Sequence, residues 1–265
     1  MTQLHGKRYW VVGASEGLGR AVTKRLATEG VRMALSARSE DRLKSLAASL
    51  PVAASVHTLD VTELASVKAA AQSVGPVDGV IVLTGVYWPM CAATFDAQQV
   101  ERMCDVNFTG TARVLSTVVP GFVARDAGHI VLTGSLSGFR GLPGAIGYGA
   151  AKAGMMHLAE NLQAELVNTG VKVQLINPGF IKTRLTDKNS FNMPFLMTPE
   201  EAAGQFVAAM QSGRFQTNFP RLFSWIFRLS NFLPAGAYYR LAGTRAQRKP
   251  AARRFTSVKR SADTS

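Results

Sequence analysis

Short runs of β-branched and apolar residues alternate along this chain with longer stretches of helical periodicity. The runs cover residues 9–13, 32–37, 56–59, 79–84, 129–133 and 171–176. Several of them are apolar almost throughout, as is typical of strands that are covered on both faces. Regular alternation of strands and helices is the pattern of βαβ units. The sequence therefore predicts an α/β fold, a doubly wound parallel sheet with helices on both faces.

The length of 265 residues suits one domain of this class with a full core. No internal repeat or interdomain linker interrupts the pattern. We expect a catalytic domain over residues 1–213, which includes a substrate lid at about 180–200. A C-terminal apolar and basic helical extension is expected over 214–246, packed on the domain or on a membrane, followed by a basic flexible tail over 247–265.

The net charge of +13 is concentrated at one end of the chain. From Ala202 onward the sequence holds eleven Lys or Arg and one acid, Asp263, so this part carries +10 and the rest is nearly neutral. The N-terminus has no apolar stretch long enough for a signal peptide or a membrane span. Two cysteines do not make a disulfide framework. These features favour a cytoplasmic protein.

A glycine-rich turn follows the first predicted strand. In "VVGASEGLGR", Gly13, Gly17 and Gly19 stand between that strand and a helix, with the spacing G-x-x-x-G-x-G. Glycine lets the backbone approach a pyrophosphate, whose charge is favoured at a helix N-terminus. The alternative is a tight turn with no ligand, but the strand–turn–helix context favours a dinucleotide site.

The end of the second strand bears on which dinucleotide binds. An NAD site usually has an acid there, roughly 20 residues beyond the glycine turn, to hold the ribose 2′-hydroxyl. Here the place is Ala37, followed by Arg38. A guanidinium suits a 2′-phosphate, although Arg38 could also be a solvated surface residue. The negative charge of Glu16, in the nearby glycine turn, counts against a phosphate. NADP(H) is the preferred cofactor over NAD(H).

Several short motifs occur in an order that resembles the short-chain dehydrogenase/reductase family. They are "GASEGLG", "LDV" at 59–61, "VNFTG" at 106–110, "GSLSG" at 134–138, "YGAAK" at 148–152 and "NPGFIKT" at 177–183. The resemblance implies a Rossmann fold and a catalytic tetrad of Asn107, Ser135, Tyr148 and Lys152. Ser137 fits the spacing to the tyrosine less well than Ser135. The residues implied to bind the cofactor are Gly13, Ser15, Glu16, Gly17, Leu18, Gly19, Arg38, Asp60, Val61, Gly85, Tyr148, Lys152, Pro178, Gly179, Ile181 and Thr183.

The chain departs from the family pattern at two places near the cofactor. Val12 stands where a threonine is usual, and the expected "NNAG" after the fourth strand is Val82-Leu83-Thr84-Gly85. Both bear on cofactor affinity rather than on the chemistry. The family also implies a homodimer through helices that begin near Val100 and Tyr148, with a tetramer as an alternative that the unusual C-terminus would block.

Tyr148 and Lys152 lie one helical turn apart, so their side chains leave the same face. A free tyrosine has a pKa near ~10. The ammonium and the positive ring of an oxidised nicotinamide would both favour the phenolate, so we expect the pKa of Tyr148 to fall towards working pH. In a reduction, Tyr148 would protonate the carbonyl oxygen while Ser135 hydrogen-bonds it. By resemblance, Lys152 also binds ribose and Asn107 relays protons.

The sequence lacks the residue patterns of metal sites, of serine or cysteine nucleophiles and of nucleic-acid binding. The four histidines show no paired ligand spacing, so no metal site is expected. No serine or cysteine stands in a G-x-S-x-G nucleophile context. No nucleic-acid recognition module accompanies the basic C-terminus, so a nucleic-acid partner is not expected.

The lid and the C-terminal extension are rich in large apolar residues. Apolar side chains at Phe139, Leu142, Ile146, Phe180, Phe191, Met193, Phe195, Leu196 and Met197 would suit a hydrophobic substrate, or would only pack the lid down. Residues 219–234 form an amphipathic helix with a narrow polar stripe of Arg221, Ser224, Arg228 and Asn231. This helix would lie on a membrane, with peripheral contact through 219–260 at its inner face, or be buried against the core, the pocket or a second subunit.

The predicted function is an NADP(H)-dependent oxidoreductase (EC 1.1.1.-) of this family, which moves hydride between the nicotinamide and a carbonyl or alcohol of an apolar substrate. The alternative is a non-catalytic NADP(H)-binding or membrane-associated interaction protein on the same fold.

Overall fold

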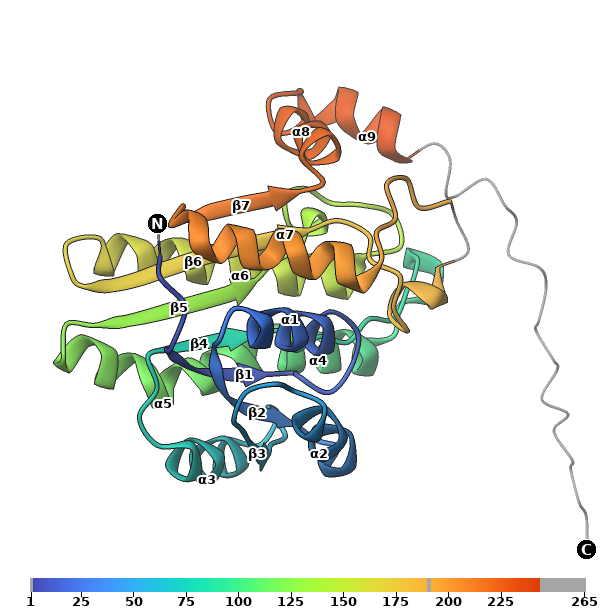
Figure 1. Ribbon diagram of the computed structural model, residues 1–265. Coiled ribbons are helices and arrows are strands. Elements are labelled where there is room, and N and C mark those ends of the chain that lie inside the picture. The colour runs from blue at the N-terminus through green and yellow to red at the C-terminus, as the bar shows by residue number, and fades with distance from the viewer. Residues whose placement is uncertain (1, 190–191, 244–265) are drawn as a thin grey trace, which may run out of the picture.

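The computed structural model describes residues 2–189 and 192–243. Their core is a seven-stranded sheet in the order β3-β2-β1-β4-β5-β6-β7, in which every neighbouring pair is parallel (Figure 1). The strands are β1 (Arg8–Val12), β2 (Arg32–Ala37), β3 (Ala54–Thr58), β4 (Gly79–Val82), β5 (Gly128–Thr133), β6 (Val171–Pro178) and β7 (Gln216–Phe219). The predicted doubly wound α/β fold is confirmed, and the chain reverses its direction of winding between β1 and β4.

Helices cover both faces of the sheet. The nine α-helices of the described residues are α1 (Gly17–Thr28), α2 (Glu40–Ala48), α3 (Leu64–Val74), α4 (Ala97–Cys104), α5 (Gly110–Ala124), α6 (Ile146–Leu166), α7 (Pro199–Ser212), α8 (Arg221–Ser230) and α9 (Ala235–Gly243). Apolar residues of α1, α2 and α7 form one buried cluster, and those of α3, α5 and α6 form another. In Figure 1, α1 and α7 lie side by side on one face.

Side chains of successive strand residues point into these two clusters in turn. Along β1, Tyr9 and Val11 belong to the cluster of α1 and α7, whereas Trp10 and Val12 belong to the other. This alternation follows from the two-residue period of a strand. Both faces of β1 are therefore buried, which explains why the strand sequences lack the polar alternation of a half-exposed sheet.

The C-terminal part differs from the sequence-based expectation. Residues 216–219, which were assigned to the extension, form β7 and pair with β6. The extension that follows is two helices, α8 and α9, where the sequence predicted one. Ser224 is buried rather than part of an exposed polar stripe, because α8 packs its Phe223–Ser224 side inward. The predicted tail over 247–265 and the lid residue Phe191 lie outside the described residues.

Candidate active site

A cavity of about 1120 Å³ opens at the carboxyl ends of the strands, where the winding reverses between β1 and β4. Open α/β sheets bind their ligands at this place. The cavity brings together all of the predicted cofactor residues and three of the four predicted catalytic residues. Its lining includes Gly13, Ser15, Glu16, Gly17, Leu18, Gly19, Arg38, Asp60, Val61, Gly85, Ser135, Tyr148, Lys152, Pro178, Gly179, Ile181 and Thr183.

The glycine turn forms one end of this cavity. Gly13 has a φ of 92°, and a Cβ there would lie 2.8 Å from the backbone nitrogen of Thr84. A Cβ on Gly19 would overlap the carbonyl oxygen of Gly13. The side chain of Glu16 does not cap α1, so the first-turn N–H groups are left for another acceptor. The turn has the close backbone approach and the uncapped helix end that a pyrophosphate needs.

Two buried hydroxyls give a second test of whether a dinucleotide fits. Within the described chain, Thr84 Oγ1 and Thr133 Oγ1 are buried without a hydrogen-bond partner. Both residues line the cavity, at the ends of β4 and β5. A buried hydroxyl without a partner costs free energy, so a ligand that supplies polar groups at this depth would be stabilised. The residues present therefore fit a nicotinamide dinucleotide.

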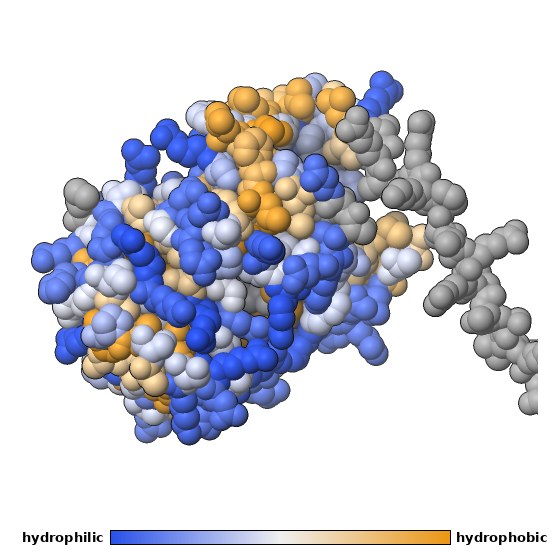
Figure 2. All heavy atoms as spheres, turned by 45° about the vertical axis from the view of Figure 1, so that its right-hand side comes forward, coloured by the Kyte–Doolittle hydropathy of each residue, from blue (hydrophilic) through white to orange (hydrophobic). Residues whose placement is uncertain are grey.

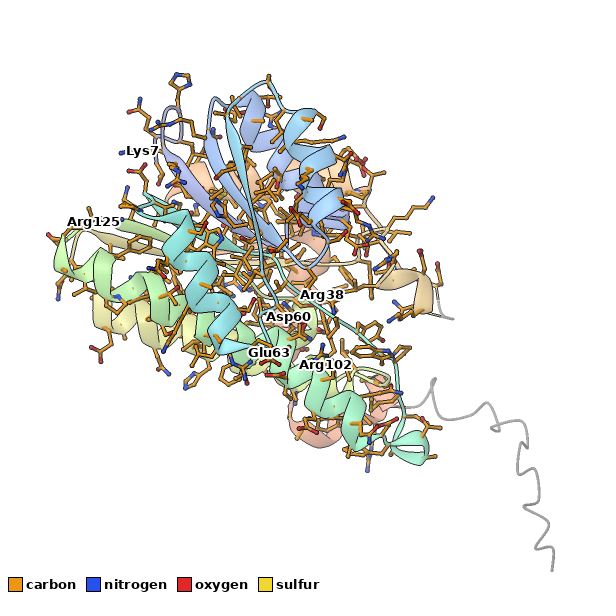
Figure 3. All side chains as sticks on the ribbon, turned by 90° about the horizontal axis from the view of Figure 1, so that it is seen from below. Lys7, Arg38, Asp60, Glu63, Arg102 and Arg125 are labelled. Atoms are coloured by element: carbon orange, nitrogen blue, oxygen red, sulfur yellow. The ribbon has the colours of Figure 1, made fainter. Side chains whose placement is uncertain are left out.

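Charged side chains gather where β2 and β3 end. Figure 3 shows Arg38, Asp60 and Arg102 close together on this side of the molecule. Partial burial raises the pKa of Asp60, but hydrogen bonds from the backbone and side chain of Thr62, at 2.9 and 2.8 Å, together with the charges of Arg38 and Arg102, leave that pKa below its usual value. Asp60 thus stays ionised and is held in place beside two guanidinium groups.

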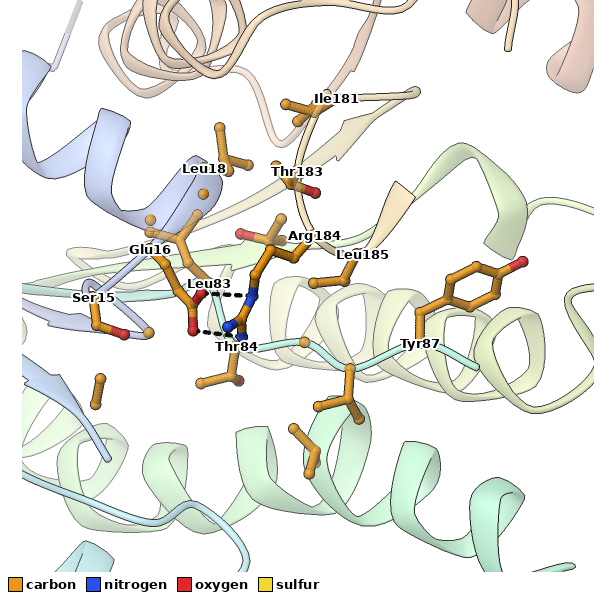
Figure 4. Close-up of a pocket in the computed structure, with 18 of the residues that line it drawn as sticks. Ser15, Glu16, Leu18, Leu83, Thr84, Tyr87, Ile181, Thr183, Arg184 and Leu185 are labelled. Atoms are coloured by element: carbon orange, nitrogen blue, oxygen red, sulfur yellow. Dashed lines mark hydrogen bonds and ion pairs between the residues drawn. The ribbon is translucent and has the colours of Figure 1, made fainter. Parts of the chain in front are cut away.

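Glu16 forms ion pairs with two arginines of the cavity wall. Its carboxylate lies 3.0 Å from Arg42 of α2. It also lies 3.0 Å from Arg184, which follows β6 (Figure 4). The pairs connect the glycine turn to the segment that begins the predicted lid. They also neutralise the carboxylate that counted against a phosphate ligand in the sequence. Arg42, Arg102 and Arg184 were not predicted as site residues.

Asn107 lies in a π-helical segment, Asp105–Thr109, between α4 and α5. Its side chain accepts a hydrogen bond from Val86 N at 2.8 Å and donates one to Val86 O at 2.9 Å. Asn107 is 1 % exposed and is not part of the cavity lining, whereas Val86 is. The amide therefore fixes the position of the chain after β4, and its role as a proton relay stays a prediction. Single π-helical turns often occur at functional sites.

Ser135, Tyr148 and Lys152 meet at the other end of the cavity. Ser135 follows β5, and the other two residues lie in the first two turns of α6. Lys152 Nζ donates to Thr133 O at 2.8 Å and lies 5.8 Å from the centre of the Tyr148 ring. The hydroxyl of Ser135 accepts a hydrogen bond from Ser137 N at 3.2 Å and also bonds Tyr148. The three predicted catalytic side chains thus converge.

The predicted fall in the pKa of Tyr148 is wrong for the protein by itself. Burial of the phenol raises its pKa to about 12, although the hydrogen bond with Ser135 acts in the opposite direction. Burial also lowers the pKa of Lys152 to about 8. Loss of hydration outweighs the attraction between a phenolate and an ammonium at this separation. The chain therefore holds Tyr148 as a protonated acid and makes the charged lysine costly.

Aromatic residues that the sequence did not mark line the catalytic end. The ring of Tyr87 contacts that of Tyr148 edge-to-face, with 5.2 Å between centroids. Trp88 also lines the cavity, and Lys188 Nζ lies 4.8 Å from its ring centre while donating to Tyr87 O at 2.7 Å. The two aromatics stand two and three residues after Gly85 of a predicted motif, so their closeness to the site could have been inferred from that position.

None of the described apolar residues that were predicted to face the substrate lines the cavity. Phe180 and Phe195 pack against Phe223 of α8, with centroids 5.8 and 5.5 Å apart, and neither lines the cavity. The packing alternative therefore holds for these two residues. The described residues also contain no group of three His, Cys, Asp or Glu placed to bind a metal ion.

Comparisons with known proteins identify the relatives of this chain. The sequence model of the family described as short chain dehydrogenase matches residues 7–193. An uncharacterized oxidoreductase of Myxococcus xanthus is 36 % identical over 241 residues, which cover 88 % of this chain and 95 % of the relative. An uncharacterized oxidoreductase of Staphylococcus epidermidis is 32 % identical over 214 residues, with coverages of 79 and 93 %.

Solved structures of related proteins contain nicotinamide cofactors. A short-chain dehydrogenase from Sphingobium yanoikuyae in complex with NADPH is 26 % identical, covers 92 % of this chain and 98 % of its own, and gives a TM-score of 0.77. An alcohol dehydrogenase from the archaeon Thermococcus sibiricus, complexed with 5-hydroxy-NADP, is 25 % identical over 80 and 95 % of the two chains, with a TM-score of 0.72.

Proposed function

The chain belongs to the short-chain dehydrogenase family of oxidoreductases, and from this premise we propose that it transfers hydride between NADP(H) and a carbonyl or alcohol of an apolar substrate. One observation carries the proposal. A single cavity has a glycine turn and an arginine cluster at one end and the convergent Ser135, Tyr148 and Lys152 at the other. This arrangement suits a dinucleotide laid across the carboxyl edge of the sheet.

The protein's part in the reaction is to move and hold protons at the substrate oxygen. Tyr148, which burial keeps protonated, donates its phenolic proton to the carbonyl oxygen. Ser135 donates a hydrogen bond to the same oxygen and stabilises its developing charge. The ammonium of Lys152 stabilises the phenolate that remains until solvent reprotonates it. Bound nicotinamide supplies the hydride that forms the new C–H bond, or accepts it in the reverse direction.

The charge distribution at the adenosine end favours NADP(H). Arg38 and Arg102 lie beside Asp60, and Ala37 stands where an NAD site would have a carboxylate. Glu16, the acid of the glycine turn, is paired with Arg42 and Arg184. A 2′-phosphate would therefore meet guanidinium groups, and the carboxylate of the glycine turn is already paired. The solved relative with NADPH agrees with this preference.

An apolar substrate is proposed from the lining of the catalytic end. Tyr87, Trp88 and Leu185 surround the space beside Tyr148. Aromatic and aliphatic walls with few polar groups suit a hydrophobic carbonyl compound. Initial rates with NADPH and aldehydes or ketones of increasing chain length would test this point, and turnover that rises with chain length is expected.

The catalytic assignment is tested by Tyr148→Phe, with Ser135→Ala and Ser137→Ala as a matched pair. General acid catalysis contributes about 10²-fold or more, so Tyr148→Phe should lower kcat by at least about that factor while NADPH still binds. Ser135→Ala should also lose activity, and Ser137→Ala should keep most of it. Equal turnover by Tyr148→Phe and the parent would refute the mechanism. Cofactor binding without turnover on any carbonyl would favour the non-catalytic alternative.

We also propose a homodimer in which the helix through Val100 (α4, which continues through residues 105–109 into α5) and α6 pack against their counterparts, as the family resemblance implies. Sedimentation velocity at micromolar concentration distinguishes a dimer from a monomer or a tetramer.

A further inference from the structure

Helices α8 and α9 form a layer at the β7 edge of the molecule, which is bonded to the loop that follows the catalytic serine. The guanidinium of Arg140 donates to Leu233 O at 3.1 Å and to Ser230 O, and it lies 4.0 Å from the ring centre of Tyr238. The hydroxyl of Tyr238 donates to Gly141 O at 2.9 Å. The layer therefore has a fixed inner side and a defined outer side.

The inner side is built around one aromatic ring. Phe223 is 7 % exposed and contacts Phe180 and Phe195 from the segment after β6, as well as Phe227 on its own helix. Ser224 is buried beside it. These contacts bury the inward-facing apolar side of α8. Its other large apolar side chains are exposed to solvent.

The outer side carries most of the large apolar side chains that are exposed on the described chain. Eight of the fourteen such residues lie here, and we name them the α8–α9 patch: Leu222, Trp225, Ile226, Leu229, Phe232, Leu233, Tyr239 and Leu241. Phe232 is 84 % exposed and Leu222 is 76 % exposed. Figure 2 shows orange side chains gathered over α8 and α9, beside the blue surface of the main body. An apolar area this concentrated marks an interaction site.

The charges around the α8–α9 patch are of one sign. Arg221 and Arg228 lie on α8, and the sequence from 202 to 262 contains no Asp or Glu. The 22 residues after Gly243 contain seven Lys or Arg and a single acid, Asp263. Apolar side chains next to a run of cations match the interface of an anionic bilayer. A second copy of this chain would bring the same cations face to face, which is unfavourable.

We propose that the α8–α9 patch seats this protein on an anionic lipid surface, with α8 and α9 in the plane of the interface. Leu222, Ile226 and Leu229, which recur at helical spacing on α8, would enter the region between headgroups and acyl chains. The basic C-terminal residues would contact lipid phosphates. No helix of the described residues is both long and apolar enough to cross a bilayer, so the contact is peripheral. The proposal does not depend on the hydride chemistry.

The test is flotation of the full-length protein with phosphatidylcholine vesicles, with and without phosphatidylglycerol. We expect binding to the anionic vesicles and weak binding to the neutral ones. Binding to the anionic vesicles should weaken in 0.5 M salt, which shortens the Debye length to about 4 Å. Ile226→Ser with Leu229→Ser should weaken binding by about tenfold or more. Arg253→Gln with Arg254→Gln should also weaken it by about tenfold.

The matched control replaces an exposed apolar residue on a helix outside the proposed dimer contact. Leu64 in α3 is 43 % exposed, and Leu64→Ser should bind anionic vesicles as the parent does. Trp225 gives a second readout, because its fluorescence should shift to the blue on binding to anionic vesicles. Circular dichroism checks that each variant is folded.

Three results would overturn the proposal. One is that the parent floats with neither kind of vesicle. Another is that Ile226→Ser with Leu229→Ser, while folded, floats as well as the parent. The third is that this variant changes the sedimentation coefficient from dimer to monomer while the parent does not bind lipid, which would assign the α8–α9 patch to a contact between copies.

Discussion

Replacement of Lys152 by methionine is expected to stabilise the folded protein at neutral pH while abolishing turnover. Lys152 is 4 % exposed, and burial lowers its pKa from 10.5 to about 8. One pKa unit corresponds to about 1.4 kcal/mol, so the charged lysine lowers the stability at pH 7 by about 3 kcal/mol relative to an unperturbed one. The hydrogen bond to Thr133 O offsets about 1 kcal/mol of any gain on its removal. A net gain of about 2 kcal/mol is expected.

The pH dependence separates this electrostatic effect from simple repacking. Because the folded pKa lies below the unfolded one, the unfolded chain binds more protons between pH 8 and 10.5, and stability rises with pH in that window. The destabilisation by Lys152 is therefore complete below pH 8 and is absent above the unfolded pKa of 10.5. The advantage of Lys152→Met should therefore shrink by about 2 kcal/mol between pH 7 and pH 10.

Urea unfolding of both proteins at pH 7, 8, 9 and 10, followed by tryptophan fluorescence, measures these differences. Lys68→Met is the control, because Lys68 is exposed on α3 and its replacement should leave the stability and its pH dependence unchanged. If Lys152→Met were less stable than the parent at pH 7, or if its advantage did not change with pH, the argument from burial would be refuted.

Three further substitutions test the cofactor site and the core. Arg38→Ala should weaken NADPH binding by about tenfold or more and leave NADH binding nearly unaffected, because a charge-assisted hydrogen bond to the 2′-phosphate is lost. Fluorescence titration measures the two dissociation constants. An unchanged ratio between them would rule out a role of Arg38 in binding the phosphate. Gly19→Ala should weaken NADPH binding by about tenfold, since its Cβ overlaps the preceding turn, whereas Gly204→Ala in α7, with open space around it, should raise stability by about 0.5 kcal/mol. Tyr9→Phe should lower the free energy of unfolding by about 1–3 kcal/mol without affecting turnover, because His129 Nδ1 loses its 2.7 Å partner in the core; an unchanged urea midpoint would show that this bond adds nothing.

Much of the fold could be predicted because it depends on local pattern. The apolar run 32–37 is β2 with the same bounds, and five other strands lie within three residues of their predicted ends. The seventh strand was missed because "QTNF" is mostly polar and only half-buried at the sheet edge. A strand of this kind is defined by its pairing with β6, which the local sequence does not reveal.

The site was predictable where a motif fixes backbone position, and less so where side chains from distant elements meet. Gly13, Ser135 and Tyr148 stand in recognisable motifs and line one cavity. The pairing of Glu16 with Arg42 and Arg184 depends on how α2 and the segment after β6 lie against the glycine turn. The pKa of Tyr148 also depends on packing, since burial, which no spacing reveals, outweighs the nearby ammonium.

The prediction of an exposed polar stripe on α8 was wrong for a related reason. Ser224 was placed in it as a polar residue, but its hydroxyl donates to Arg221 O at 2.7 Å within the helix. A serine that satisfies its own hydrogen bond can be buried at small cost. The side of α8 that carries Phe223 and Ser224 therefore faces inward, and the apolar residues at helical spacing around Ile226 face out.

The same packing connects the α8–α9 patch with both walls of the catalytic end. Arg140 joins the layer to the loop that begins at Ser135, and Phe223 joins it to the segment after β6 that carries Arg184. A force on α8 and α9 therefore acts on the loop beside the catalytic serine and on the predicted lid. If the patch rests on lipid, the contact would hold these two walls in one arrangement and place them next to a source of apolar substrate. Lipid binding and turnover of long-chain carbonyls should then rise and fall together in the variants of Ile226 and Leu229.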